Sequence, residues 1–420
     1  MAREMKDSGI EWIGEIPSEW KVLRTKNAYS HHKNVVGNKS DNYERLALTL
    51  NGVIKRSKED STGLQPEAFN SYQILRENEL VFKLIDLENI STSRVGLSPF
   101  EGLVSPAYIV LEPKENAFSK FGFYYFLSMW HRYIFNHLGD DGVRSSLNSS
   151  DLLNIPYVAP PLPEQHRIAD FLDRKCAEID RVLEKTRASI EEYKKLKQSV
   201  ITQAVTKGVR GEREMKDSGI EWIGEIPAEW KITRIKWLLQ ERKEYSQLGN
   251  EEPLSMSQKH GIIPTRLMEA IPNMASSFVG SKIVHSGDLV FNKLKAHLGV
   301  FSISCHNGIV SPDYAVYYAT GVADVKFLQY LFKTDKYITE FKKRSTGVGA
   351  GLTRLYTDGL FSIHTALPLI NEQVRIVAYL DKKCSEIETL ICKKEQFITE
   401  LESYKKSFIY EYVTGKKEVQ

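Results

Sequence analysis

One nineteen-residue segment occurs twice in this chain, and the repeat constrains the fold more than any other feature of the sequence. Residues 3–21 and 213–231 are identical at 18 of 19 positions, at an offset of 210 residues. Further on, residues 164–180 match residues 372–388 at 10 of 17 positions. Internal similarity of this kind predicts that one structural unit is present twice in the 420-residue chain.

Between these matched ends the two copies diverge. The intervening segments, 22–163 and 232–371, are 142 and 140 residues long and share only short apolar landmarks, such as GLVSPAY at 102–108 and GIVSPDY at 308–314. Uniform drift after a duplication without functional meaning would have eroded ends and middles alike. The pattern therefore favours a fixed scaffold that holds two variable regions.

A long helix is expected at the end of each copy. After the proline-rich segment 160–163, apolar residues recur at spacings of mostly three, four or seven, and no Pro or Gly interrupts the run before Gly208. The second copy shows the same pattern and ends at Gly415. A helix of about 40 residues would span about 60 Å, and its single apolar stripe needs a partner.

The obvious partner of each long helix is the other long helix, paired antiparallel, although each could instead fold back on its own globular domain. The predicted fold class is therefore two α/β (α+β) globular domains, separated by two long antiparallel coiled-coil helices and related by a pseudo-twofold axis. The expected boundaries are 1–159 for the first domain, 160–212 for the central helix, 213–366 for the second domain and 367–420 for the C-terminal helix.

Each globular domain is expected to be mixed α/β. Short apolar runs bounded by Gly, Pro, Asn and Ser predict strands at Leu46–Leu50, Leu80–Leu84, Ala107–Leu111, Asp288–Phe291 and Gly308–Tyr317. One helix per domain is expected, at Phe121–Leu138 and Val325–Phe341. The aromatic residues of these helices recur at helical spacing, so they are expected in the core rather than as platforms that stack on bases.

Basic residues cluster around the predicted strand ends and the loops after these helices, mixed with Asn, Gln and Ser. Such side chains hydrogen-bond phosphates and base edges, although any one of them can instead only solubilise the surface. The net charge of +3 is only a weak indication of a polyanionic partner, because acidic residues elsewhere can offset a basic face in the total. The candidate DNA-binding residues are Lys83, Arg94, Arg144, Asn148, Lys259, His260, Lys293, Lys295, His297, Arg344 and Arg354.

Cysteine usage and hydropathy exclude several other classes of protein. The four cysteines form no C-x-x-C pair, and no His cluster has zinc-finger spacing, so no metal site is expected. Reduced thiols, together with an N-terminus that lacks an apolar signal core, predict a cytoplasmic location. No apolar run approaches the roughly 18 residues that span a bilayer.

Two local segments resemble catalytic motifs, and neither is convincing. Residues 154–157 (NIPY) resemble the Asn-Pro-Pro-Tyr motif of adenine methyltransferases but lack its first proline, and 362–365 in the second copy do not resemble it. The glycine-rich segment 347–351 follows the basic run 341–346 rather than the buried strand that a nucleotide-binding loop requires. We therefore expect no catalytic residue in this chain and interpret 154–157 as a strand.

The repeated phrases identify a family that the chain resembles: the specificity subunit of type I restriction–modification systems. The resemblance is carried by residues 8–20 (SGIEWIGEIPSEW), their repeat at 218–230, and PLPEQHRI at 161–168, which leads into a long helix. The second copy departs from this pattern, with Ile370 and Asn371 where the first has Leu162 and Pro163. The match covers essentially the whole chain.

The resemblance implies a non-catalytic subunit in a system of phage defence. Two target recognition domains would each read one half of a bipartite, asymmetric sequence in double-stranded DNA. The helices would set the gap between the halves and dock two modification subunits that use S-adenosylmethionine to methylate adenine. Restriction subunits with ATP- and Mg²⁺-dependent translocase and nuclease activity would join them, and this chain would hold no cofactor.

Two other functions stay open at the level of the sequence. One is a self-contained DNA methyltransferase that uses segments 154–157 and 347–351, and the other is a scaffold that assembles protein subunits without reading DNA. Binding of S-adenosylmethionine by the isolated chain would favour the first. Sequence-selective DNA binding that survives charge-neutral substitution of Lys293, Lys295 and Arg344 would favour the second. The sequence specifies neither the target nor the gap.

Overall fold

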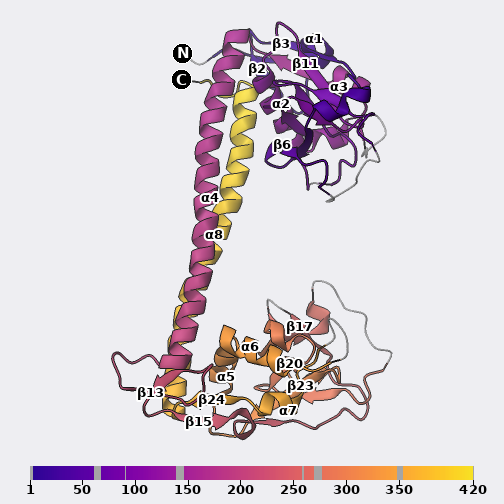
Figure 1. Ribbon diagram of the computed structural model, residues 1–420. Coiled ribbons are helices and arrows are strands. Elements are labelled where there is room, and N and C mark those ends of the chain that lie inside the picture. The colour runs from indigo at the N-terminus through magenta and orange to yellow at the C-terminus, as the bar shows by residue number, and fades with distance from the viewer. Residues whose placement is uncertain are drawn as a thin grey trace. The chain divides into compact units, whose positions relative to one another are not determined.

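The computed structural model describes residues 3–60, 68–89, 91–138, 146–257, 260–268, 277–347 and 353–419. The chain divides into two compact units: unit 1 comprises Met1–Arg187 and Gln396–Gln420, and unit 2 comprises Ala188–Glu395. Both boundaries fall inside long helices, so each unit combines one α/β body with a part of each helix (Figure 1).

The body of unit 1 contains two four-stranded sheets. One has the order β4-β11-β8-β9, with strands Tyr29–His31, Ile109–Pro113, Leu80–Phe82 and Val95–Leu97. The other has the order β6-β5-β10-β7, with strands Gly52–Arg56, Arg45–Thr49, Gly102–Val104 and Gln73–Leu75. Two further pairs are β1 (Met5–Asp7) with β2 (Glu15–Pro17), and β3 (Lys21–Arg24) with β12 (Pro156–Ala159). The helices are α1 (Thr25–Ala28), η1 (Gly37–Asn42), α2 (Ser119–His131), η2 (Ile134–His137) and α3 (Ser149–Asn154).

Unit 2 repeats the first of these sheets and has two separate strand pairs in place of the second. Its main sheet has the order β16-β23-β20-β21, with strands Leu239–Glu241, Tyr314–Ala319, Leu289–Asn292 and Phe301–Ile303. The other strand pairs are β17 (Leu254–Ser257) with β18 (Gly261–Pro264), β19 (Lys282–Val284) with β22 (Gly308–Val310), β13 (Met215–Asp217) with β14 (Glu225–Pro227), and β15 (Lys231–Arg234) with β24 (His364–Leu367). The short helices are η3 (Ile235–Trp237), η4 (Thr265–Leu267), η5 (Ala296–Leu298), α5 (Val325–Phe332), α6 (Asp335–Arg344) and α7 (Thr357–Phe361).

The apolar strand β8 contributes side chains to two separate hydrophobic clusters of unit 1. Successive side chains of a strand point to opposite faces, so Leu80 and Phe82 pack into a cluster with Phe126 of α2. Val81 points the other way and packs against Leu48 of the second sheet. In unit 2, β20 is divided between two clusters in the same alternating way.

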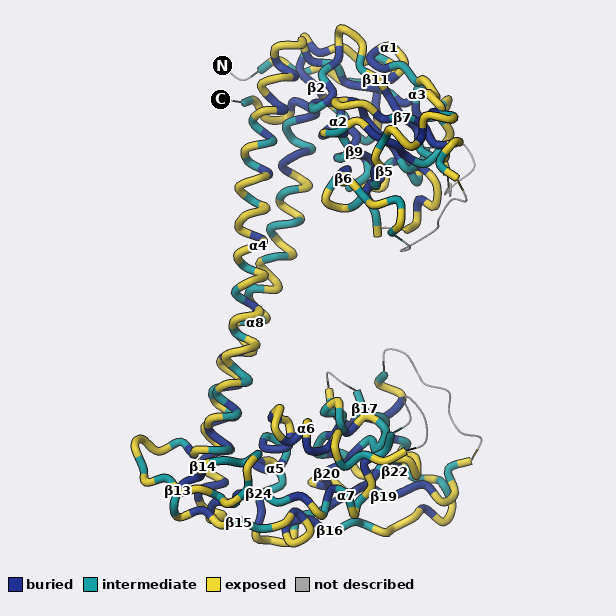
Figure 2. The backbone as a smooth tube through the Cα atoms, viewed as in Figure 1, coloured by how far each residue is buried: buried dark blue, intermediate teal, exposed yellow. Residues whose placement is uncertain are grey.

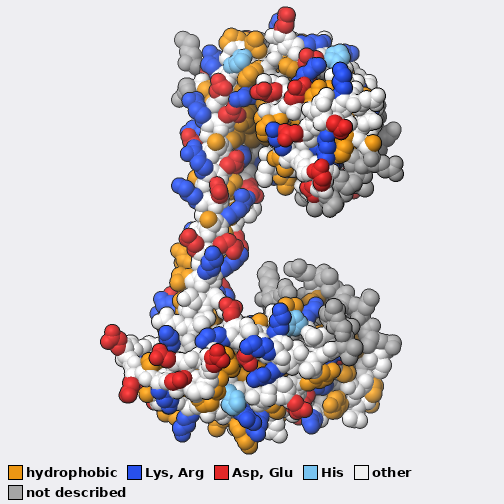
Figure 3. Space-filling view, viewed as in Figure 1, with side chains coloured by type: hydrophobic (Ala, Val, Ile, Leu, Met, Phe, Trp, Pro, Cys, Tyr) orange, Lys and Arg blue, Asp and Glu red, His pale blue; other side chains and the backbone are white. Residues whose placement is uncertain are grey.

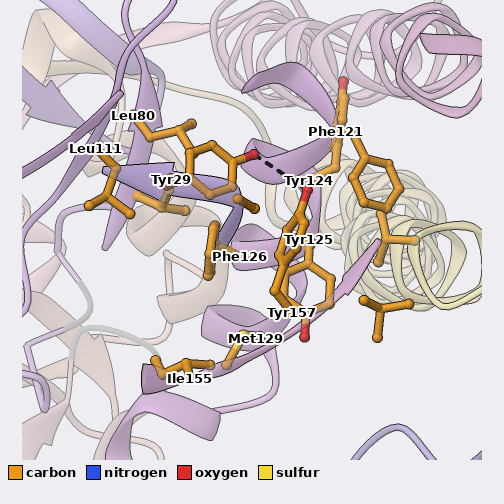
Figure 4. Close-up of a cluster of buried hydrophobic side chains, with 14 of the residues drawn as sticks. Tyr29, Leu80, Leu111, Phe121, Tyr124, Tyr125, Phe126, Met129, Ile155 and Tyr157 are labelled. Carbon is orange, nitrogen blue, oxygen red and sulfur yellow. Dashed lines mark hydrogen bonds between the residues drawn. The ribbon is translucent and has the colours of Figure 1, made fainter. Parts of the chain in front are cut away.

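The aromatic residues of α2 form the centre of the unit 1 core, as expected from their helical spacing. Phe126 and Tyr125 pack edge to face against each other and surround Tyr157 of β12 (Figure 4). The hydroxyl groups of Tyr29 and Tyr157 lie 3.4 Å apart. Tyr157 is fully buried, so segment 154–157 leads into a core strand and does not present an aromatic ring to a base.

Three predicted elements were wrong in their extent. The single strand expected at Gly308–Tyr317 is two strands. A turn, in which Tyr314 N–H donates to Ser311 C=O at 2.9 Å, separates β22 from β23. The helix expected at Val325–Phe341 is two helices, and Thr334 between them bonds locally to Leu331 C=O. The helix expected at Phe121–Leu138 ends at His131, because Tyr133 has a left-handed φ of 59°. The short helix η2 follows as a separate element.

The two long helices are α4 (Leu162–Lys207), with 46 residues, and α8 (Ile370–Val413), with 44 residues. In unit 1, the Phe171 ring of α4 lies 4.8 Å from the Tyr412 ring of α8, and Asp180 pairs with Lys405 at 2.6 Å. Residue numbers rise along α4 while those of its partners fall, so the helices pair antiparallel. Outside the contact stripe most of their residues are exposed or half-buried (Figure 2).

The same antiparallel pairing is present in unit 2, where Lys197 of α4 bonds to Glu388 of α8 and Lys394 lies over the Tyr193 ring. The helix ends also pack on the α/β bodies: Ile168 and Leu172 join the unit 1 core, and Ile376 joins that of unit 2. Helix pairing and docking on the body, expected as alternatives, therefore occur together. Among the described residues, no helix is both long and apolar enough to cross a membrane.

A buried polar cluster explains why the repeated ends are so alike. The Trp20 ring is fully buried, and its Nε1 donates to Glu164 Oε2 at the start of α4 (3.0 Å). Arg3 pairs with the same carboxylate at 2.7 Å and lies over the Trp20 ring. Unit 2 repeats this Arg–Trp–Glu clamp with Arg213, Trp230 and Glu372. Each clamp attaches the first turn of a long helix to the repeated segment.

Candidate nucleic-acid interface

Two of the candidate DNA-binding residues of unit 2 meet where the chain enters and leaves the glycine-rich segment. Thr346 and Arg354 pair through two backbone hydrogen bonds of 3.0 and 2.8 Å. Leu355 N–H donates to Lys293 C=O (3.0 Å), which places Lys293 beside Arg354. Partial burial, followed by the positive charge of Lys282, lowers the pKa of Lys293. Of the segment 347–351, residues 348–351 lie outside the described residues.

Both basic side chains contact the loop after β22. Lys293 Nζ donates to Pro312 C=O at 2.9 Å, and Arg354 lies 3.6 Å from the Asp313 carboxylate. These contacts are exposed or half-buried and hold the cations only weakly.

Lys295 and His297 lie at η5 and Arg344 ends α6, and these two elements pack against each other. We call these three residues the η5–α6 cluster. Ile338 of α6 lies beside Gly299, whose left-handed φ of 75° ends η5. His297 Nδ1 and Arg344 Nε are buried and have no hydrogen-bond partner among the described residues. Figure 3 shows Lys, Arg and His side chains close together on the part of unit 2 where Figure 1 places α6.

His260 stands on the turn between β17 and β18 and is exposed. It lines a groove of about 570 Å³, together with Leu298 of η5 and Gln329 and Lys333 of the α5 region. The groove extends from His260 to the end of η5, and Lys295, His297 and Arg344 do not line it. Lys259, the neighbouring candidate, lies outside the described residues.

The candidates of unit 1 are less accessible. Arg94 is only 1% exposed, and its guanidinium donates to the backbone carbonyls of Asp86 and Asn89. Burial lowers the pKa of Arg94 and also that of the neighbouring Lys83, whose Nζ donates to Thr92 Oγ1 at 3.2 Å. Arg94 thus supports the loop after β8 in this structure rather than facing solvent.

Asn148 and Arg144 belong to the segment before α3. The Asn148 side chain accepts a hydrogen bond from Asp151 N–H at 3.0 Å and caps α3. Leu147 N–H donates to Leu84 C=O (2.8 Å), so Asn148 lies near the strand end that carries Lys83. Arg144 lies outside the described residues. Leu147 and Leu84 thus repeat the backbone contact made by Leu355 and Lys293 in unit 2.

The sequence pattern did not point to one cleft of unit 2. A cavity of about 790 Å³ is lined by charged and aromatic side chains, and Lys293 is the one candidate residue in its lining. Arg242 lies there over the Tyr318 ring and makes two bonds to Asp288, at 2.7 and 2.9 Å. The charged run 241–244, which begins at the end of edge strand β16 and continues into the segment after it, was the available signal.

The family model described as the Type I restriction modification DNA specificity domain matches residues 17–192. Two curated proteins of Methanocaldococcus jannaschii are similar over most of their length. The specificity subunit assigned to the type I restriction enzyme MjaX is 25% identical, over 97% of this chain and 96% of its own. The specificity subunit of the type I restriction enzyme MjaVIII is 24% identical, over 84% and 82%.

Two solved structures share the fold. A chain from a structure of complex assembly and conformational transition in the type I R-M system aligns with a TM-score of 0.70 and 14% identity, over 96% of this chain and 99% of its own. The HsdS subunit of Thermoanaerobacter tengcongensis aligns with a TM-score of 0.53 and 15% identity, over 96% and 98%.

Proposed function

Because the chain belongs to the family of type I restriction–modification specificity subunits, we propose that it directs such a complex to a two-part DNA sequence. The α/β body of unit 1 reads one half of the site, and that of unit 2 reads the other. The two halves differ, so the target is asymmetric.

The observation that carries this proposal is the contrast between frame and surface in the two units. Both have the same strand order in the main sheet and the same Arg–Trp–Glu clamp. Their loops after β8 and β20 differ: unit 1 buries Arg94 there, whereas unit 2 presents Lys295 next to His297. One frame with two different surfaces suits a protein that recognises two different half-sequences.

Recognition would divide into contacts that position the protein and contacts that read bases. Lys293, Lys295 and Arg354 suit phosphate contacts, since Lys and Arg supply most of the sequence-independent attraction to DNA. Arg344, His260 and Asn148 have the donors and acceptors that distinguish base edges. Each well-placed base contact contributes about 1–3 kcal/mol of discrimination.

The paired helices would serve as spacer and docking surface. Their exposed faces, outside the contact stripe, offer alternating charges to two modification subunits. A spacer that joins two weak readers raises the combined affinity without any new contact to DNA. In double-stranded DNA, a fixed spacer also selects which groove faces the two bodies meet.

We assign the chemistry to other subunits. Modification subunits would bind S-adenosylmethionine and methylate adenine, and restriction subunits would use ATP and Mg²⁺ in the cytoplasm of the host. Within the described part of the chain, the segment that resembles a methyltransferase motif ends in the buried Tyr157. That burial argues against a self-contained methyltransferase.

The test is to express the chain with its modification subunits and to map methylated adenines across the genome. We expect a two-part motif with a constant gap. Replacement of residues 22–159 by those of a relative should change one half only. A one-part motif, or a motif unaffected by the replacement, would contradict the proposal, and S-adenosylmethionine binding by the isolated chain would revive the methyltransferase alternative.

A further inference from the structure

Helices α2 and α5 share a Lys and a Tyr four residues apart, although they lie in the divergent parts of the two copies. Helix α2 contains Lys120 and Tyr124 in the run SKFGFYYF, and α5 contains Lys326 and Tyr330 in the run VKFLQYLF. Residues four apart lie on one face of a helix. In both units this face is directed at a long helix.

Both pairs contact one Asp, with the same geometry. In unit 1, Lys120 Nζ donates to Asp173 Oδ2 at 2.8 Å, and the Tyr124 hydroxyl donates to Asp173 Oδ1 at 2.7 Å. In unit 2 the corresponding distances to the two carboxylate oxygens are 2.7 and 2.8 Å, and the residues are Lys326, Tyr330 and Asp381. We call each arrangement a Lys–Tyr–Asp clasp.

Each clasp works with a second attachment near the start of the same short helix. The Gln165 side chain accepts from Phe118 N–H at 2.9 Å and donates to Asn116 C=O at 3.1 Å. Unit 2 has the same attachment, made by Gln373 to Asp324 N–H and Val322 C=O. Two attachments along one short helix define its direction on the long helix, which a single contact does not.

Stability alone does not account for the two clasps. The side chains of Lys120 and Asp173 are 39% and 40% exposed, and ion pairs this exposed add little to folding. The Tyr hydroxyl is the more constraining partner: burial raises the pKa of Tyr124 and of Tyr330, so both remain protonated donors. A charge-assisted hydrogen bond from a buried phenol has a narrow geometry. The clasps therefore fix the direction of each short helix on its long helix and add little to the free energy of folding.

We propose that Asp173 and Asp381 are positioning residues that fix the orientation of each α/β body on its long helices and thereby restrict the DNA gap that the protein accepts. This inference rests on the proposed function. Successive base pairs are rotated by about 35° around the DNA axis, so a body free to tilt could meet a half-site one base pair away. The clasps would then set gap selectivity without contacting DNA.

The experiment uses the complete chain in complex with its modification subunits. The substrates are three DNA duplexes with the same two half-sequences and with gaps one base pair shorter than, equal to and one base pair longer than the natural gap. The variants are Asp173→Ala, Asp381→Ala and the conservative Asp173→Asn, which keeps an acceptor for Tyr124. Glu15→Ala, at an exposed position of strand β2, removes the same charge away from the clasps and from the faces of the long helices, and is the control.

For the wild type we expect methylation at the natural gap to exceed that at either neighbouring gap by at least tenfold. Asp173→Ala and Asp381→Ala should lower this ratio several-fold with unchanged half-sequences, Asp173→Asn should lower it less, and Glu15→Ala should leave it unchanged. An unchanged ratio, or an equal loss at all three gaps, overturns the inference. If a variant does not fold, Tyr124→Phe gives the same comparison by removing one oxygen. A wild-type protein without any two-part target contradicts the proposed function instead.

Discussion

At the residue scale, a few buried polar side chains hold each α/β body to the long helices. Glu164 is buried and accepts hydrogen bonds from the Trp20 indole and from Arg3. A buried carboxylate is tolerated because its partners compensate for the water that it has lost. The clamp therefore depends on all three members at once.

Removal of the carboxylate from the clamp should destabilise unit 1. Glu164→Ala leaves the Trp20 N–H without its acceptor and the partly buried Arg3 without its buried partner. We expect a loss of about 2–4 kcal/mol in the free energy of unfolding, measured by urea denaturation. Glu19→Ala, which removes the exposed partner of Arg3, is the control and should cost less than about 1 kcal/mol. Equal losses for the two variants would show that the buried Glu164 stabilises unit 1 no more than the exposed Glu19 does.

A half-buried histidine, His131, makes stability depend on pH. Burial, followed by the charges of Lys406 and Lys405, lowers the pKa of His131 to about 4. The unfolded chain binds the proton near pH 6.5, whereas the folded chain does not until about pH 4. The folded state should therefore lose about 3 kcal/mol as the pH falls through this window.

The measurement compares the unfolding free energies of the wild type and His131→Gln between pH 7.5 and 4.5. Carboxylates that titrate in acid affect both proteins equally, so the difference isolates the histidine. The advantage of the wild type over the variant should shrink as the pH is lowered. A constant difference would show that His131 titrates normally in the folded chain.

At the element scale, the two long helices were predictable from the sequence, whereas the break that separates α5 from α6 was not. A heptad-like pattern with no internal Pro or Gly determines α4 and α8 locally. The break between α5 and α6 instead depends on a local bond made by Thr334, a residue type that helices also tolerate. Arg94 illustrates the same limit for the candidate site, because its partners are backbone carbonyls that no sequence pattern reveals.

The η5–α6 cluster gives the element-scale test of DNA binding. Lys295→Ala should weaken binding to all sequences similarly and lower the slope of log affinity against log salt by about 1, because one phosphate contact is lost. Substitution of Lys293, Lys295 and Arg344 together should abolish sequence-selective binding. Lys216→Ala, on the hairpin strand β13, is the control and should change neither quantity. Selective binding that survives the triple substitution would show that these residues do not read the target, and absence of selective binding by the wild type would favour an assembly scaffold.

At the scale of the whole molecule, the repeat predicted two equivalent units, and the strand orders of the main sheets of units 1 and 2 agree with it. It did not predict that the compact units divide at positions 187 and 395, inside the helices. The reason is physical: each helix end is buried in a body, while the clamps join residues more than 140 positions apart in sequence. Periodicity reports local structure and carries no information on such long-range pairs.

The central claim is that one frame presents two independent readers. It is tested most directly by a chain in which residues 232–366 are replaced by a second copy of residues 22–159, expressed with the modification subunits. Mapping of methylated adenines should then give a target whose two halves are both the half-sequence read by unit 1, with the gap unchanged. Retention of the original asymmetric target, or a change in the half read by unit 1, would contradict the claim.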